Sequence, residues 1–189
     1  MKILIGCETS GTVRNAFLEK GHDAWSCDIL PADDHTNRHI QDDIRNVLKM
    51  EAWDLMMVAH PPCTRLCNSG VRWLDNPPEG KTVQEMWEEL DEGAALFSDL
   101  WNADIPRIAI ENPIMHKHAR ARIANFQAPQ YVQPYEFAES VEAEDNVSKR
   151  TGLWLKNLPL LKKTSNLTRE TARHDIHLAS PGPDRWKFR

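Results

Sequence analysis

The stretch "AHPPCTRLCNSG", residues 59–70, places two cysteines in a turn-rich loop directly after a hydrophobic run. Two prolines precede Cys63, and their rigid backbone limits the directions in which the thiol can point. A cysteine in such a loop can be a nucleophile, a metal ligand, or a small apolar side chain in a turn. The residues at the other strand ends help to decide between these roles.

Polar or reactive residues follow other predicted strands as well. The run "KILIG" leads into the turn "GCETSG", a second run ends near Asp28, Asp43 precedes a short helix, and a later strand ends in Glu111-Asn112. Ligands of open parallel sheets bind outside the carboxyl ends of the strands, where an acid after the second strand holds ribose hydroxyls. Each residue alone has a simpler role in a turn or helix cap. Together they favour a cofactor that contains a nucleoside.

Known phosphate-binding motifs are missing from the first turn. "GCETSG" lacks the G-x-G-x-x-G spacing of dinucleotide-binding proteins, and the Walker phosphate loop is absent from the chain. The sequence therefore predicts a nucleoside-containing cofactor that is bound without strong pyrophosphate contacts.

Strands that alternate with helices predict an α/β fold, a doubly wound and mostly parallel sheet of Rossmann-like type. The longest helical pattern, 82–102, has an apolar stripe of Met86, Leu90, Ala94, Phe97 and Trp101. We expect one domain over residues 1–189, an acidic loop at 138–148 and an irregular tail from about residue 164. The predicted strands are 2–6, 22–30, 53–60, 106–113, 130–137 and 150–159, and the predicted helices lie within 7–21, 41–50, 82–102 and 116–126.

The composition is that of a soluble globular protein, with 41% hydrophobic and 27% charged residues and a net charge of −5. Residues 1–104 carry nine basic and 19 acidic residues, a balance of −10, whereas residues 105–189 carry 14 and nine, a balance of +5. Only the C-terminal part could therefore attract phosphates. No apolar run could span a membrane, and "MKILIG" lacks a signal-peptide layout, so we expect a cytoplasmic protein with no disulfide framework.

At these positions the chain resembles the DNA cytosine-5 methyltransferases. "PPCTRLCNSG" resembles their Pro-Cys loop, with Cys67 in place of the family's serine and Gly70 at its glycine. "IENP" resembles the Glu-Asn-Val element, "CETSGTVRNAFLEKG" the first cofactor loop and helix, and "QDDI" the Asp-Ile element. Arg150 in "SKRTGLWL" matches the Arg-rich strand entry. The chain is also similar to short phage-type proteins described as cytosine methyltransferase-like, which share "KRTGLWLKNLP" and "SPGPDRWK" almost as written.

The resemblance implies transfer of a methyl group from S-adenosylmethionine to carbon 5 of cytosine. Cys63 would add to carbon 6, Glu111 would hold the base edge near nitrogen 3, Asn112 would brace the pocket, and Arg150 would contact the base or backbone. Arg65 and His60 are possible cations for the thiolate. The residues expected to contact the cofactor are Gly6, Cys7, Glu8, Ser10, Gly11, Asp28, Ile29, Asp43, Ile44 and Pro61.

The chain departs from the family after the Arg-rich strand. Full-length members carry a target-recognition region there, whereas only about thirty residues follow "WLKNLP". We therefore expect the substrate to be single-stranded DNA, a short motif read by few contacts, or DNA presented by a partner protein, with methylation of a non-duplex nucleotide substrate as an alternative. A non-catalytic module that binds cofactor or nucleic acid, such as a phage regulator or decoy, is the alternative, and the oligomeric state stays open.

Other chemistries fit the residues less well. A zinc deaminase needs H-x-E before P-C-x-x-C, but three residues separate Cys63 from Cys67. A zinc site from His60, the two cysteines and a third thiol has unusual spacing, so we expect no metal. An amino-methyltransferase needs an Asp or Asn at position 60 and an aromatic at 63. Trp73 could stack on a base or pack the loop, and His116 and His118 are expected at the surface.

Overall fold

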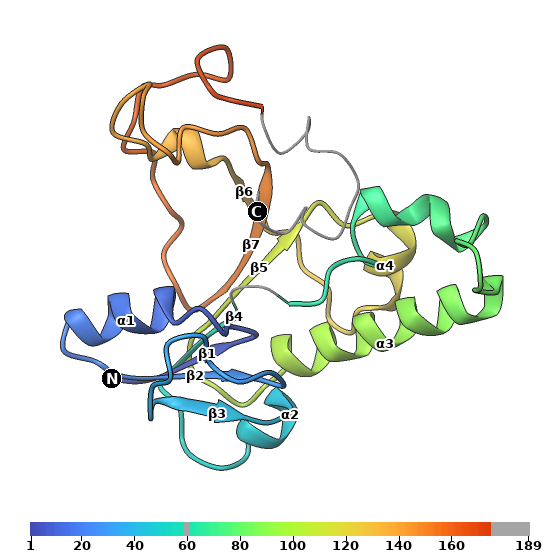
Figure 1. Cartoon of the computed structure of the whole chain (residues 1–189), viewed down its shortest axis with the longest axis horizontal. Coiled ribbons are helices and arrows are strands. Elements are labelled where there is room, and N and C mark those ends of the chain that lie inside the picture. The colour runs from blue at the N-terminus through green and yellow to red at the C-terminus, as the bar shows by residue number, and fades with distance from the viewer. Residues whose placement is uncertain (59–60, 175–189) are drawn as a thin grey trace.

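The computed structural model describes residues 1–58 and 61–174. Its centre is a seven-stranded sheet with the order β3-β2-β1-β4-β5-β7-β6 (Figure 1). Strands β3, β2, β1, β4 and β5 pair in parallel, whereas β7 is antiparallel to both β5 and β6. The predicted α/β class and the mostly parallel sheet are confirmed. The strands are β1 (Lys2–Gly6), β2 (Asp23–Asp28), β3 (His39–Gln41), β4 (Leu55–Val58), β5 (Ile108–Pro113), β6 (Gln130–Val132) and β7 (Thr151–Lys156).

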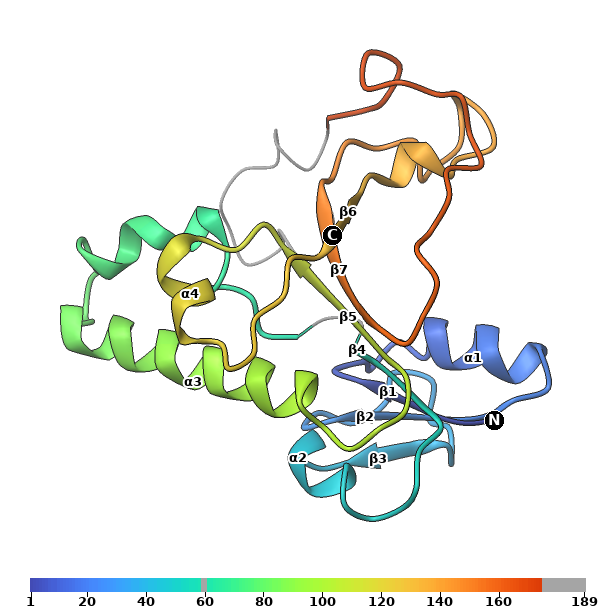
Figure 2. The ribbon, with the colours of Figure 1, turned by 180° about the vertical axis from the view of Figure 1, so that it is seen from behind.

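Helices cover both faces of this sheet (Figures 1 and 2). One face is covered by α1, and the opposite face by α2, α3 and α4. Two short 3₁₀ helices, η1 and η2, lie in the connections after β4 and β6. The helices are α1 (Thr12–Glu19), α2 (Ile44–Val47), η1 (Asn68–Leu74), α3 (Val83–Trp101), α4 (Lys117–Arg122) and η2 (Pro134–Glu136).

Side chains that alternate along the strands build two separate cores. Ile3 and Ile5 of β1 point toward α1, whose Val13 and Phe17 pack against them. Leu4, between them in the chain, points to the other face and joins the larger core under α3. Successive side chains of a strand point to opposite faces, so a strand buried on both sides is hydrophobic throughout. This explains why "KILIG" has no polar alternation.

The long helix α3 begins and packs as its sequence predicts. Thr82 and Glu85 form a capping box, in which each side chain accepts a hydrogen bond from the other residue's main-chain N–H. The five residues of the predicted apolar stripe are all buried, and Leu100 joins them. Phe97 contacts Trp154 of β7 edge to face, with ring centroids 5.1 Å apart. This contact ties α3 to the antiparallel strand.

Three parts of the fold differ from the sequence prediction. Strand β3 was not predicted, because three residues are too short to show an apolar alternation. Helix η1 was missed since its start is a turn within the cysteine-rich loop. Only Gln130–Val132 of the predicted strand 130–137 is extended, because Pro134, which cannot donate to a sheet, begins η2.

Residues 133–150 together with 161–174 form a mostly irregular lobe above β6 and β7 in Figure 1, which contains the short helix η2. Asn146 is fully buried in this lobe, and its side-chain amide donates to the carbonyls of Val141 (2.8 Å) and Thr171 (2.9 Å). The predicted acidic loop therefore contains an ordered hydrogen-bonded turn. None of the helices in the described ranges is both long and apolar enough to cross a membrane.

Candidate active site

The register of the sheet brings the predicted site residues to one edge. Cys27 of β2 pairs with Gly6 of β1, Gly6 pairs with Val58 of β4, and Val58 pairs with Ile110 of β5. The chain continues one residue beyond this row to Asp28, Cys7 and Glu111. These three positions come from different strands, and they lie at the carboxyl edge where ligands of such sheets bind.

The turn after β1, residues 7–11, which we call the first turn, is built on two left-handed residues. Cys7 has φ of 56° and Gly11 has φ of 72°. Glu8 lies between them and is 2% exposed. Its carboxylate accepts hydrogen bonds from the main-chain N–H groups of Val13 (2.6 Å) and Arg14 (3.2 Å) at the start of α1.

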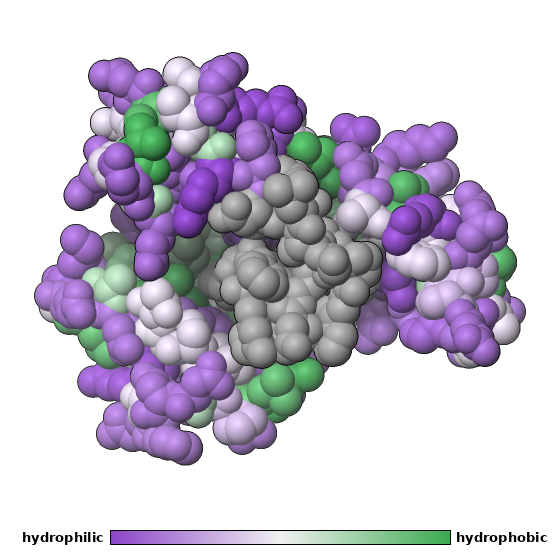
Figure 3. All heavy atoms as spheres, turned by 45° about the horizontal axis from the view of Figure 1, so that its top comes forward, coloured by the Kyte–Doolittle hydropathy of each residue, from purple (hydrophilic) through white to green (hydrophobic). Residues whose placement is uncertain are grey.

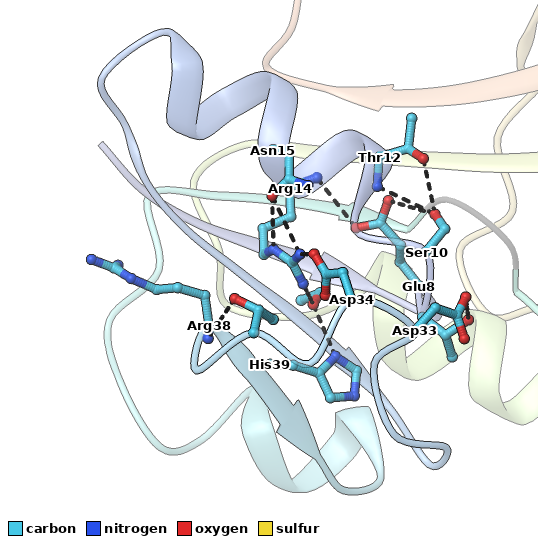
Figure 4. Close-up of polar contacts among 12 residues, drawn as sticks. Glu8, Ser10, Thr12, Arg14, Asn15, Asp33, Asp34, Arg38 and His39 are labelled. Carbon is cyan, nitrogen blue, oxygen red and sulfur yellow. Dashed lines mark hydrogen bonds and ion pairs between the residues drawn. The ribbon is translucent and has the colours of Figure 1, made fainter.

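The role of Glu8 explains the missing phosphate motif. The N-terminus of a helix attracts anions, and it holds phosphates in nucleotide-binding folds. Here the carboxylate of Glu8 already occupies that position, and the Ser10 hydroxyl lies 3.5 Å from it (Figure 4). A pyrophosphate would therefore have to compete with a built-in anion. Glu8 was predicted to contact a cofactor, and the structure places its carboxylate on the helix instead.

Gly6 and Ile44 fit together behind the first turn. A Cβ atom added to Gly6 would lie 2.1 Å from Cδ1 of Ile44, so only glycine leaves room for that side chain. Ile44 is 6% exposed and belongs to the larger core. A contact between Ile44 and a cofactor could therefore come only from its main chain.

An acidic and apolar surface follows β2. The Asp28 carboxylate accepts a hydrogen bond from the N–H of Leu30 (3.0 Å), and the next residue, Ile29, is 71% exposed. Asp43 caps α2 by accepting from the N–H of Arg45 (2.9 Å), and this hydrogen bond lowers the pKa of its carboxyl. An exposed isoleucine next to Asp28 in the chain suits a ligand that has a flat apolar ring and hydroxyl groups.

A buried arginine that the prediction did not include fixes this region (Figure 4). Arg14 of α1 is fully buried; it donates to the Ser26 hydroxyl (2.8 Å) and forms an ion pair with Asp34. Ser26 lies 2.9 Å from Nδ1 of His39, and Nε2 of His39 donates to the Leu30 carbonyl (2.9 Å). Since a carbonyl can only accept, His39 carries its proton on Nε2. Buried arginines are rare without partners, but the sequence did not reveal which residues would pair with this one.

Two thiols next to the first turn are held in the neutral form. Burial raises the pKa of Cys7 and of Cys27 to about 12, and the neighbouring carboxylates of Asp28 and Asp43 act in the same direction. Such thiols are poor nucleophiles at neutral pH because only the thiolate reacts. Within the described chain neither of them is in a disulfide.

The loop after β4 that holds the other two cysteines, residues 61–70, is here called the Pro-Cys loop. The Cys63 carbonyl accepts hydrogen bonds from the N–H groups of Leu66 (2.9 Å) and Cys67 (3.0 Å), which closes a helical turn. A Cβ atom added to Gly70 would lie 1.9 Å from the Thr64 carbonyl oxygen. The close approach of η1 to this turn therefore requires glycine. Pro61 is buried at the base of the loop, and His60 lies outside the described residues.

The segment after β5 anchors the Pro-Cys loop. His116 donates its N–H to the Leu66 carbonyl (3.1 Å) and Nε2–H to the Arg65 carbonyl (2.6 Å), while Nδ1 accepts from the N–H of Ala119 (3.1 Å). These partners assign a neutral ring, and burial lowers its pKa. The expectation of a surface position is wrong for His116, which is 4% exposed, because its ring caps α4 from inside.

Cys67 has the acidic thiol of this loop. Hydrogen bonds lower its pKa to about 5, the largest contribution coming from the Cys63 thiol and smaller ones from Ser69 and Gly70 at the start of η1. Its sulfur lies 3.0 Å from the Ser69 hydroxyl. Cys67 thus fills the helix-capping position that serine would fill. Arg65, a predicted cation for the thiolate, instead pairs with Glu89 of α3 at 2.6 Å.

Glu111 and Asn112 point to opposite faces of β5. Ile108, Ile110 and Asn112 are buried toward α3, and Glu111 alternates with them. Asn112 is completely buried, with a relative exposure of 0%. Within residues 1–58 and 61–174, neither its Oδ1 nor its Nδ2 has a hydrogen-bond partner. A buried amide without partners is costly, about 1–3 kcal/mol, and marks a place for a ligand or an ordered water.

The remaining predicted residue, Arg150, lies at the rim of the site. It is exposed, precedes β7, and its guanidinium stacks over the Tyr131 ring at 4.3 Å from the centroid. Arg72 stacks over Trp73 in the same way at 4.5 Å. The structure therefore brings the Pro-Cys loop, Glu111 and the first turn together, and it leaves Arg150 and Trp73 in stacked pairs with their neighbours.

Comparison with known proteins adds no relative. No model of a protein family matches the chain, and no curated protein matches it. In the described part of the chain, no group of three or more histidine, cysteine or acidic side chains is arranged to hold a metal ion. The site must therefore be interpreted from its own geometry.

Proposed function

We propose that this protein is an S-adenosylmethionine-dependent methyltransferase that modifies carbon 5 of cytosine in DNA through a covalent bond to Cys63. The observation that carries the proposal is the meeting of three elements at one sheet edge. They are the Pro-Cys loop, which packs against the start of η1, Glu111 near the end of β5, and the first turn after β1, which suits a nucleoside.

The topology supports the methyltransferase fold within the broader α/β class. The dinucleotide-binding order is 3-2-1-4-5-6 with parallel strands. Here β7 is inserted antiparallel between β5 and β6. This insertion is typical of S-adenosylmethionine-dependent methyltransferases, in agreement with the fold that the sequence resemblance implies.

The residues at the first turn and after β2 fit this cofactor. S-adenosylmethionine has a ribose, an adenine, a sulfonium cation and no phosphate. Asp28 lies where ribose hydroxyls are held, and Ile29 offers an exposed apolar surface to adenine. Glu8, Asp28 and Asp43 add negative charge around a cationic ligand, whereas Glu8 opposes a phosphate.

The protein's own residues would supply the base chemistry. The Cys63 thiolate adds to carbon 6 of cytosine, and Glu111, as a protonated acid, donates to ring nitrogen 3, which takes up the displaced electron pair. The cofactor supplies the methyl group that carbon 5 receives. Loss of the carbon 5 proton to a base then expels the Cys63 thiolate and restores the aromatic ring. Asn112, on the opposite face of β5 from Glu111, has an amide without a partner among the described residues.

The surroundings of the site suit a nucleic acid more than a small molecule. Arginines stack on aromatic rings at Arg72–Trp73 and at Arg150–Tyr131, the combination that holds bases and phosphates in single-stranded complexes. Figure 3 shows that the coloured surface in this view is mainly hydrophilic. Methylation also needs a base outside the duplex stack, and a single strand meets this need directly.

The test is covalent trapping. The protein is incubated with S-adenosylmethionine and an oligonucleotide that contains 5-fluorocytosine, whose carbon 5 fluorine cannot be removed as a proton, so the adduct persists. We expect a complex that survives denaturing electrophoresis and whose mass spectrum places the DNA on Cys63. The same oligonucleotide should be offered as single and double strands.

Two variants make the result specific. Cys63→Ala should abolish the complex, whereas Cys27→Ser should retain it because the serine hydroxyl can still donate to the Asp42 carbonyl, as the Cys27 thiol does at 3.3 Å. Calorimetric titration with S-adenosylmethionine should show micromolar binding to the wild type and to Cys63→Ala. Cofactor binding without any trapping would favour a non-catalytic module, and absence of both would refute the proposal.

A further inference from the structure

The Pro-Cys loop holds a second sulfur beside the proposed nucleophile. The N–H of Cys67 donates to the Cys63 carbonyl at 3.0 Å, and the Cys63 thiol donates to the Cys67 sulfur. One turn of helix separates the Cα atoms of such residues by about 6 Å, within the range that a disulfide spans. The backbone already holds the two side chains on the same side of a closed turn.

The two sulfurs differ in access and in acidity. Cys63 is half-buried, so a small solute can reach it, whereas Cys67 is 7% exposed beneath it. A hydrogen bond from the Cys63 thiol, and smaller contributions from Ser69 and Gly70, favour the thiolate of Cys67, whose pKa is about 5. An accessible thiol next to a stabilised thiolate is the arrangement in which oxidation leads to a disulfide.

We propose that Cys63 and Cys67 form a reversible disulfide in the presence of peroxide, and that this bond inactivates the site. The inactivation rests on the methyltransferase function proposed above, because it removes the sulfur that would add to cytosine. The disulfide itself rests only on the geometry of the loop.

The oxidation balances with hydrogen peroxide as the oxidant. The Cys63 proton passes to the Cys67 sulfur, and the Cys63 thiolate attacks one peroxide oxygen, so that a sulfenic acid forms and hydroxide leaves. The hydroxide takes the proton from Cys67 and becomes water. The Cys67 thiolate then attacks the Cys63 sulfur, the S–S bond forms, and a second hydroxide leaves and takes a proton from solvent. Two sulfurs are oxidised, one peroxide becomes two waters, and a dithiol reverses the bond.

The other two cysteines provide an internal control. Cys7 and Cys27 are also neighbours, since the residue before Cys7 pairs with Cys27 across β1 and β2. Their pKa values of about 12 leave almost no thiolate at neutral pH. At pH 7 we expect oxidation of the Pro-Cys loop to exceed that of this pair by at least about 10-fold, because thiolate populations differ by far more.

The experiment exploits a tryptic site between the two cysteines. Trypsin cleaves after Arg65, so a bond between Cys63 and Cys67 joins the peptides 50–65 and 66–72. The reduced full-length protein is treated with peroxide at pH 7, its remaining thiols are alkylated, and the digest is analysed by mass spectrometry. We expect the joined pair, lighter by two hydrogens than its separate members, and its loss after treatment with dithiothreitol.

The matched variant is Cys67→Ser, which removes the second sulfur and places a favoured residue at the N-cap position of η1. It should give no joined peptides, while Cys27→Ser should give them as the wild type does. A wild-type digest that lacks the joined pair at every peroxide concentration would overturn the proposal. A bond that involves Cys7 or Cys27 in place of the loop cysteines would overturn it too.

Trapping with 5-fluorocytosine DNA before oxidation, after oxidation and after reduction separates the two proposals. We expect trapping to fall at least about 10-fold on oxidation and to return with dithiothreitol, because a disulfide sulfur cannot add to the base. A joined peptide pair in a protein that never traps DNA would refute the methyltransferase function alone. Trapping that peroxide does not affect, with no joined pair, would refute the disulfide alone.

Discussion

The first turn and the Pro-Cys loop lie on neighbouring strands at one edge of the sheet, yet they use their polar groups differently. Around the first turn, Glu8 and Arg14 are buried and fully engaged with partners of the chain itself. Around the Pro-Cys loop, Asn112 is buried with both amide atoms unmet among the described residues. The first region therefore forms a rigid support, and the second has hydrogen-bonding capacity left for a ligand.

The thiols of the two regions differ in the same way. Burial beside carboxylates raises the pKa of Cys7 and Cys27 to about 12, whereas a hydrogen bond from the Cys63 thiol, with smaller contributions from Ser69 and Gly70, lowers the pKa of Cys67 to about 5. All of these sulfurs are largely shielded from solvent. Burial, reinforced by carboxylates, suppresses the thiolates of Cys7 and Cys27, whereas hydrogen bonds outweigh burial at Cys67.

The largest effect on the free energy of unfolding should come from removing the buried contacts of Arg14. Arg14→Met removes a buried side chain that donates to the buried Ser26 hydroxyl and pairs with the partly exposed Asp34. We expect the free energy of unfolding to fall by about 3 kcal/mol, the upper end for a buried polar group that loses its partner, measured by urea denaturation. Arg38→Met is the control, because Arg38 pairs with Asp23 at the surface and should cost at most about 1 kcal/mol. Equal losses in the two variants would contradict the assigned role of Arg14.

The next effect concerns the close packing of the Pro-Cys loop. Gly70→Ala would place Cβ 1.9 Å from the Thr64 carbonyl, so the cysteine turn must move. We expect a loss of about 1–3 kcal/mol in stability and a roughly 100-fold slower trapping reaction. Gly93→Ala in α3 is the control: its Cβ meets Leu66 at an ordinary 3.5 Å, and alanine favours helix. Trapping by Gly70→Ala at the wild-type rate would show that the loop tolerates the shift.

Asn112 and Asn146 should respond in opposite directions to the same substitution. Asn112→Leu removes an amide without partners and should raise the free energy of unfolding by about 1–3 kcal/mol while weakening ligand binding. Asn146→Leu removes the donor to two carbonyls and should lower it by about 1–3 kcal/mol. Urea denaturation and cofactor calorimetry measure both. Destabilisation by Asn112→Leu would mean that its amide is satisfied.

The smallest effect is the pH dependence that His116 contributes. Its pKa is lowered from 6.5 in the folded protein, so the unfolded chain binds the proton more readily. The stability from this group is complete above the unfolded pKa of about 6.5 and is lost progressively as the pH falls below it. Urea midpoints between pH 8 and pH 5 should therefore decline less in His116→Gln than in the wild type. Identical slopes would contradict the neutral ring assigned here.

The sequence predicted the parts of the fold that depend on local patterns. The apolar runs of β1, β4 and β5 and the stripe of α3 follow from periodicity, whereas the capping box of Thr82 and Glu85 was not predicted. Strand β3 and the inserted antiparallel β7 depend on pairing between distant segments. Such pairing leaves no local signal in a single sequence.

In the candidate site too, local sequence patterns predicted some residues, whereas others depend on contacts between distant elements. Strand-end positions led to Cys63, Glu111 and Asp28, because polar residues after buried strands collect at one edge. The partners of Arg14 and the inward turn of His116 could not be predicted, since they arise from contacts between elements far apart in the chain. The acidity of Cys67 was missed because it depends on a hydrogen bond from the Cys63 thiol and on the start of η1, which were not predicted.

Contacts run from Arg14 through Ser26 and His39 to the Leu30 carbonyl. They determine whether the segment after β2 loses its conformational entropy on folding or on ligand binding. Ordering one backbone residue costs roughly 1–2 kcal/mol in conformational entropy. Because these contacts hold Ile29 and Leu30 in place in the ligand-free chain, that entropy is lost during folding. A nucleoside that settles on this segment would meet a preorganised surface, and its affinity would not be reduced by ordering the segment.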